Sequence, residues 1–154
     1  MTVDEFALFL DRFRNDVKEQ APDIIAETAV EYSKEAFSKK AWDKQAWQTA
    51  TTPKRTGSLL IDSGALANSI RPAVVNEREV IISAGDNKVG YAQVHNEGYR
   101  GPVNIPAHTR KGHNVAAHTR TVNIPARPFL GKSNELFDRV KTRLEATIRQ
   151  ILNR

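Results

Sequence analysis

A short internal repeat with reversed order constrains this chain more than any other feature of its sequence. Val-Asn-Ile-Pro-Ala occupies residues 103–107 and again 122–126, and His-Thr-Arg occupies 108–110 and again 118–120. The two units change order between the copies, so the segment is approximately mirrored about residues 111–114. Two antiparallel strands satisfy that symmetry, and Gly112 can supply the positive φ that a tight turn needs. We therefore predict a hairpin in which residues 103–110 pair with residues 117–124.

The prolines of the repeat define what kind of hairpin this is. Pro106 and Pro125 have no backbone N–H to donate to a neighbouring strand, so the segment is an edge ribbon or a mobile arm. A two-stranded ribbon is only marginally stable alone, and we expect a neighbouring subunit to order it. We call residues 99–126 the arm.

Helical periodicity marks both ends of the chain. Thr2 and Glu5 have capping-box spacing before a predicted helix over residues 3–19, and Pro22 can begin a second helix that reaches about residue 40. Ser133 is a candidate N-cap for a C-terminal helix. The predicted apolar face of that helix consists of Phe137, Val140, Leu144, Ile148 and Ile151.

The middle of the chain changes character repeatedly. Residues 42–60 have no sustained period and read as a loop, in which Trp42 and Trp47 are either core anchors or a contact surface. Residues 62–70 predict a short helix capped by Asp62 or Ser63. Three β-favouring runs follow at 72–75, 79–84 and 91–95, which is typical of an antiparallel meander.

These elements predict one α+β domain over residues 1–154. N-terminal helices (1–48) and a C-terminal helix with its lead-in (127–154) pack on a small antiparallel sheet. A loop (49–61), a short helix with the meander (62–98) and the protruding β-hairpin arm (99–126) complete the chain.

Charge is distributed unevenly, and this bears on partners. Residues 1–97 carry 12 basic and 15 acidic groups, whereas residues 98–154 carry 11 basic and 3 acidic groups. A basic half favours a polyanion or an acidic protein surface as partner. The chain contains no cysteine, which excludes disulfides, thiol nucleophiles and cysteine-ligated metals. The first residues have no signal-peptide pattern, no membrane-spanning run is readable, and we expect a cytoplasmic site of synthesis.

No catalytic constellation is readable in the sequence. The phosphate-loop, dinucleotide and nucleophile-elbow patterns are missing, and carboxylates concentrate on the predicted solvent faces of the first helices. The arm holds three histidines, but no carboxylate or cysteine lies between Arg100 and Gly131 to complete or orient a zinc site. A solvated basic hairpin is therefore favoured over a metal-dependent hydrolase, and we predict neither enzymatic activity nor a cofactor. His95 is interpreted as a packed or turn-stabilising histidine.

Three segments in a fixed order carry a resemblance to a known family. They are Ser-Gly-x-Leu-x-x-Ser-Ile at 63–70, Tyr-Ala-Gln-Val-His-Asn-Glu-Gly at 91–98 and Pro-Ala-Arg-Pro-Phe-Leu-Gly at 125–131. With the helix that follows them, they resemble the phage virion morphogenesis, or tail-completion, family over residues 58–152. The resemblance implies a structural protein of the phage neck that acts in tail completion and head-tail joining, without catalysis. The long mirrored arm departs from a minimal member of the family.

The resemblance also implies partners and a location. We expect a homo-oligomeric ring, most simply a hexamer. The ring is expected to contact tail-terminator, tail-tube and head-connector proteins. We also expect at most weak contact with genomic DNA, no membrane, synthesis in the bacterial host cytoplasm and a final location in the virion. The alternative function is a basic nucleic-acid-binding module.

Two groups of side chains follow from these interpretations. The expected partner or oligomer contacts are Arg100, Val103, Ile105, His108, Arg110, Lys111, His113, His118, Arg120, Arg139 and Arg143. The expected scaffold positions of the family motifs are Ser63, Gly64, Leu66, Ser69, Ile70, Tyr91, His95, Gly98, Pro125, Arg127, Pro128, Phe129 and Leu130.

Overall fold

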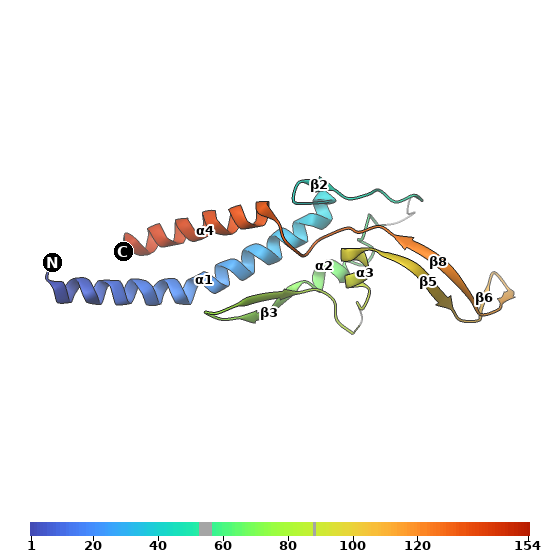
Figure 1. The fold of residues 1–154 in the computed structure, drawn as a ribbon, viewed down its shortest axis with the longest axis horizontal. Coiled ribbons are helices and arrows are strands. Elements are labelled where there is room, and N and C mark those ends of the chain that lie inside the picture. The colour runs from blue at the N-terminus through green and yellow to red at the C-terminus, as the bar shows by residue number, and fades with distance from the viewer. Residues whose placement is uncertain (53–56, 88) are drawn as a thin grey trace.

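One long helix, and not two, forms the N-terminal third of the protein. In the computed structural model, which describes residues 1–52, 57–87 and 89–154, helix α1 runs without interruption from Val3 to Lys39 (Figure 1). The predicted capping box is present, because Thr2 Oγ1 accepts from Glu5 N and a Glu5 carboxylate oxygen accepts from Thr2 N. The predicted division into residues 3–19 and 23–40 is wrong.

Pro22 lies inside α1 and explains why the helix is not straight. A proline in a helix interior removes one backbone hydrogen bond and its ring crowds the carbonyl one turn back, so the helix bends and does not have to end. Figure 1 shows the dark blue N-terminal half of α1 running at an angle to its light blue C-terminal half. The N-terminal half projects past the C-terminus of the chain and leaves several large apolar side chains exposed, including Phe6, Leu8 and Leu10.

The C-terminal half of α1 is the central element of the core. Helix α4 (Asn134–Leu152) runs antiparallel to it on one side, and the hairpin of β3 (Arg71–Val75) and β4 (Val80–Ser83) lies on the other (Figure 1). Ser133 caps α4 as predicted, because its side chain accepts from Leu136 N. Phe137 was expected on the buried face of α4, but it is 67% exposed and the half-buried Leu136 packs on the core instead.

The predicted three-stranded meander is a two-stranded hairpin. Strands β3 and β4 pair as expected, but residues 91–95 do not form a third strand, because helix α3 spans Ala92–Glu97. Helical geometry buries Ala92 in the core and turns His95 and Asn96 toward the segment that leads into α4. A strand was predicted because Tyr91 and Val94 favour strands. The tertiary contacts that favour the helix come from distant residues and do not appear in a short sequence window.

The short helix before β3 forms, but it is shorter and starts differently. Helix α2 spans Ala65–Asn68 with Gly64 at the N-cap, so neither Asp62 nor Ser63 is the N-cap, although Ser63 Oγ accepts a long hydrogen bond from Ala65 N at 3.4 Å. A two-residue ladder of β1 (Ala41–Trp42) and β2 (Gln45–Ala46) follows α1 within the predicted loop. The described strands form four separate two-stranded ladders, so the predicted sheet is divided into hairpins within an α+β fold.

Aromatic side chains from distant parts of the chain meet at the centre of the molecule. Phe37 and Phe129 are almost completely buried with ring centroids 5.0 Å apart, and Trp47 meets Phe37 edge-on at 5.6 Å. Trp42 and Trp47 are both buried, which confirms that they are core anchors. Among the residues that the structure describes, no helix has the length and apolar content that crossing a membrane requires.

Candidate functional site: the arm and a motif-lined cavity

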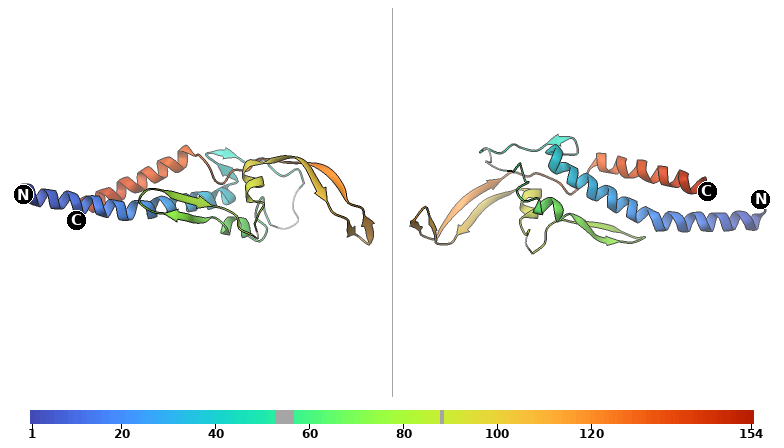
Figure 2. Two further views of the ribbon diagram at one scale, coloured as in Figure 1. Left: turned by 60° about the horizontal axis from the view of Figure 1, so that its bottom comes forward. Right: turned by 180° about the vertical axis from the view of Figure 1, so that it is seen from behind.

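The predicted arm exists and projects from the body. Strand β5 (Tyr99–Ile105) pairs antiparallel with β8 (His118–Ile124), and β6 (His108–Arg110) pairs with β7 (His113–Val115) beyond them. Within the described parts of the chain these strands form ladders only with one another. The arm extends from the end of the molecule opposite the two termini (Figures 1 and 2).

The register of the arm differs from the prediction because the turn sets it. The partners are Val103 with Arg120 and Arg110 with His113, which leaves Lys111 and Gly112 as a two-residue loop. Both loop residues have positive φ, 50° and 81°, which is the backbone of a type I′ turn. Gly112 is at the turn as predicted, but the predicted pairing of residues 103–110 with 117–124 would centre the hairpin between residues 113 and 114, two residues beyond the observed centre between Lys111 and Gly112.

The ribbon is interrupted at the same level on both strands. Pro106 and Ala107 lie between β5 and β6, and Ala116 and Ala117 lie between β7 and β8. The Nδ1 of His108 donates to the Pro106 carbonyl at 3.0 Å, and the Nδ1 of His118 donates to the Ala116 carbonyl at the same distance. These two bonds hold the backbone locally where the ladder stops, and the tip turns away from the longer ribbon (Figure 2).

The arm residues expected to contact partners lie at the surface of the protein. Those that are exposed are Arg100, Val103, His108, Arg110, Lys111, His113, His118 and Arg120, and Ile105 is half-buried. The arm carries four basic side chains and no acidic one. Among the described residues, no group of three or more histidine, aspartate or glutamate side chains is placed to hold a metal ion. Contact of these residues with a partner remains a prediction.

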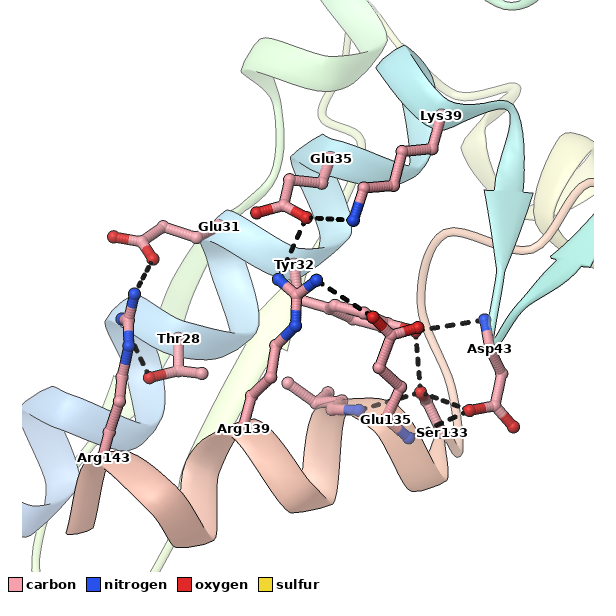
Figure 3. Close-up of polar contacts among 11 residues, drawn as sticks. Thr28, Glu31, Tyr32, Glu35, Lys39, Asp43, Ser133, Glu135, Arg139 and Arg143 are labelled. Atoms are coloured by element: carbon pink, nitrogen blue, oxygen red, sulfur yellow. Dashed lines mark hydrogen bonds and ion pairs between the residues drawn. The ribbon is translucent and has the colours of Figure 1, made fainter.

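Arg139 and Arg143 of α4, which are among the expected partner contacts, bind side chains of α1 (Figure 3). The guanidinium of Arg139 makes ion pairs with Glu35 at 2.9 Å and Glu135 at 3.0 Å, and lies over the Tyr32 ring. Arg143 bridges Thr28 and Glu31 one turn further along. Their structural role in holding α4 against α1 was missed, because helix periodicity does not reveal which charges meet across a helix pair.

A second polar network joins the start of α4 to the end of α1 (Figure 3). Asp43 Oδ1 accepts from Ser133 Oγ at 2.9 Å and from Glu135 N at 3.0 Å, while Asp43 N donates to the Tyr32 hydroxyl. The hydrogen bonds from Glu135 N and Ser133 hold the pKa of Asp43 below its ordinary value. Asp43 therefore acts as a second cap for α4, supplied by a residue 90 positions earlier.

The three family-like segments converge on one cavity, which sequence spacing could not show. Ser63, Leu66, Tyr91, His95 and Arg127 all line a cavity of about 390 Å³ on the side of the core nearest the arm. Each of the three segments contributes to this wall. The cavity is lined in addition by Leu59 and Leu60.

The remaining motif residues build the frame of the cavity. Ser69 Oγ accepts from Gly85 N at 2.9 Å and donates to the Leu66 carbonyl. Ile70 and Phe129 are among the most buried side chains in the core, and Leu130 packs against it. Gly98 ends α3 with φ of 80°, and a Cβ there would come within 2.8 Å of Ala126 N, so only glycine fits where the two strands of the arm leave the body.

The lead-in to α4, residues 125–133, is held through its backbone. Asn96 Oδ1 accepts from Phe129 N and Leu130 N, and Trp47 Nε1 donates to the Pro128 carbonyl at 2.8 Å. Arg127 N donates to the His95 carbonyl at 2.8 Å. An extended segment without strand partners thus has its backbone groups satisfied by side chains and by α3. Neither Asn96 nor Asp43 was identified from the sequence, because their partners lie more than 30 residues away.

A comparison with protein-family models identifies the chain. The model of the phage virion morphogenesis family matches residues 23–151, which include α2, α3, the arm, the lining of the cavity and all of α4 but its last residue. No curated protein and no solved structure matches the chain. Because the match covers most of the sequence and contains all three converging segments, the protein belongs to the phage virion morphogenesis family.

Proposed function

We propose that the protein is a structural subunit of the phage neck that completes the tail and helps to join it to the head. The observation that carries this proposal is the arm, a projecting ribbon whose strands pair only with one another among the described residues. A two-stranded ribbon is marginally stable alone, and an exposed one presents backbone and side chains to a neighbouring subunit. Family membership supports a role in building the virion.

The subunit acts in a homo-oligomeric ring in this proposal. Head-to-tail contacts between identical subunits generate a closed ring when the rotation between neighbours closes. The arm at one end of the body and the projecting half of α1 at the other provide two separate surfaces for such contacts (Figure 1). Tail-terminator, tail-tube and head-connector proteins are the expected neighbours of the ring.

Shortening the arm tests this function directly. Ile105 and His118 are register partners, so residues 106–117 can be replaced by Asn-Gly while β5 and β8 remain paired. Phage carrying this variant should form separate heads and tails that fail to join, which electron microscopy of lysates can count. Normal joining with the shortened arm, or absence of the protein from purified particles and their precursors, would contradict the proposal.

A charge-reversed pair supplies the matched control. Arg110→Glu with Lys111→Glu alters the arm tip, whereas Arg78→Glu alters the exposed turn of the β3–β4 hairpin, which lies along α1. Joining should fall with the first variant and be retained with the second. Equal loss in both would indicate a general effect of charge and not a role of the arm.

The basic arm also favours a second candidate, a contact with nucleic acid. Its four basic side chains are unopposed by acidic ones within residues 99–126. Binding through phosphates would weaken steeply as salt rises, with a slope of about 0.9 per phosphate contacted in a plot of log affinity against log salt. Duplex affinity of the Arg110→Glu, Lys111→Glu variant, compared with its joining activity, separates this candidate from the structural one.

A further inference from the structure

Arg127 is a buried cation without an acidic partner in the described parts of the chain. The residue as a whole is only 7% exposed, and its Nε donates to the Gln48 carbonyl at 3.0 Å. A guanidinium has five N–H donors, so four remain for other acceptors. Burial lowers the pKa of Arg127, but an arginine stays charged at neutral pH. The remaining nitrogens are not among the fully buried unpartnered atoms of the described residues, so they are open to a ligand, and a cation with so little contact with water gains when an anion binds it.

The unused donors belong to a residue that lines the motif cavity. Leu59, Leu60 and Leu66 form apolar parts of the wall, and Ser63, Tyr91 and His95 add polar groups. A concave apolar site with a few polar groups is the usual form of a binding pocket, and about 390 Å³ lies within the common range. A side chain or a chain terminus fits such a volume, whereas a nucleic-acid duplex does not.

The charge arrangement favours a single carboxylate as the occupant. Asp62 also lines the cavity, but it is exposed. One buried guanidinium matches the planar, singly charged carboxylate, to which its N–H groups can donate in parallel. Among the described residues of the wall, a phosphate dianion would meet only this one buried cation, and it would be repelled by Asp62 at the exposed part.

We propose that the cavity binds a carboxylate of another protein chain, either an acidic side chain or a C-terminus, and that Arg127 pairs with it. The evidence for an anion site is the burial of Arg127 and the cavity that it lines. The identification of the occupant as a virion subunit rests on the proposed function. The carboxylate comes from a second copy of this chain or from another virion protein, and the experiment separates these two sources.

The first arm of the experiment measures the site itself. Acetate is titrated into the full-length protein, and the ¹⁵N–¹H resonance of Arg127 Nε is followed by NMR, with its assignment taken from Arg127→Lys. We expect a saturating shift at Arg127 and at the amides of Tyr91 and His95. Arg127→Lys should bind at least about tenfold more weakly, because an ammonium lacks the fork geometry. Arg78→Gln, which removes an exposed arginine from the turn of the β3–β4 hairpin, should bind as the native protein does.

The second arm identifies the source of the carboxylate. Sedimentation of the native protein is compared with that of Arg127→Gln and with the native protein in excess acetate. If self-association is lost both in Arg127→Gln and in the native protein with excess acetate, the carboxylate belongs to a second copy of the chain. Unchanged self-association together with saturable acetate binding assigns it to another virion protein.

Several results would overturn the proposal. They are a shift at Arg127 that does not saturate, equal acetate binding by folded Arg127→Lys, or a response to inorganic phosphate at lower concentration than to acetate. Because acetate binding is measured on the isolated protein, a failure of the arm variants to affect joining would refute the neck function without altering the result at the cavity.

Discussion

The side chain of Asn96 bonds the backbone of Leu130 in both directions. Asn96 Nδ2 donates to the Leu130 carbonyl at 3.1 Å, and Asn96 Oδ1 accepts from Leu130 N at 3.0 Å. The same oxygen also accepts from Phe129 N at 2.9 Å. The side-chain amide of Asn96 therefore supplies the lead-in with the backbone hydrogen bonds that a neighbouring strand would supply in a sheet. These bonds hold Phe129 in the core.

Asn96→Ala should lower the free energy of unfolding by about 2–4 kcal/mol, because it leaves two or three partly buried backbone groups without partners. Asn96→Asp, which keeps the acceptor and loses the donor, should have a smaller effect. Chemical denaturation measures both. Gln93→Ala on the exposed face of α3 is the control and should stay within about 0.5 kcal/mol of the native protein. Equal stability of Asn96→Ala and Gln93→Ala would refute this role.

Arg139→Met should weaken the attachment of α4 to α1. The substitution removes two ion pairs and the contact over Tyr32, while the aliphatic part of the side chain is kept. Since the Arg139 side chain is 32% exposed, we expect a loss of about 1–2 kcal/mol that shrinks at high salt. Lys141→Met, on the exposed face of α4, is the matched control. A loss that does not respond to salt would assign the effect to packing.

Acid should destabilise the protein through the carboxylates at the α1–α4 junction. Hydrogen bonding lowers the folded-state pKa of Asp43 below 3.8, and a hydrogen bond from Lys39 with those from Arg139 lowers that of Glu35 below 4.5. Their contribution is therefore complete above these values and is lost as the pH falls through the lower folded-state values. Asp43→Asn keeps an acceptor oxygen without a titrating group, so its stability should depend less on pH in this range. Denaturant unfolding at a series of pH values measures the slope of each protein, and parallel slopes would contradict the assignment.

The arm tip should be sensitive to Gly112 without affecting the core. Gly112→Val places a β-branched residue at φ of 81°, at a local cost of about 1–2 kcal/mol, although space around the Cβ is open. Amide exchange over residues 108–115 should accelerate while global unfolding is unchanged, because the tip lies outside the core. Lys111→Asn should preserve protection, since Asn-Gly suits a type I′ turn. A fall in global stability with Gly112→Val would mean that the arm folds together with the body.

Local signals in the sequence identified the elements that depend on local chemistry. The capping box at Thr2, the cap at Ser133 and the turn glycine of the arm each act within a few residues, and all three are present. The α+β class and the existence of the hairpin followed from the same kind of signal. The strand register of the hairpin could not be predicted in this way. It is set by the two residues with positive φ at the turn and not by the symmetry of the repeat.

The errors fall where distant contacts override local preference. Residues 92–97 form a helix whose Asn96 bonds the lead-in, a contact that no local window contains. Helix α1 continues through Pro22 because a proline can bend a helix without ending it, and Pro22 is only half-buried there. The scaffold role of the three motifs was expected, but the cavity between them required the fold to bring Ser63, Tyr91 and Arg127 together.

The base of the arm determines how a mechanical load would travel through the subunit. One strand leaves the body at Gly98 and the other returns at Pro125, next to the segments that Asn96 and the His95 carbonyl tie together. Tension applied at the tip is therefore shared between α3 and the lead-in before it reaches α4. The arm is thus a tether with both ends anchored at one clamp, so a pull on it loads the backbone hydrogen bonds of that clamp before it reaches the β3–β4 hairpin.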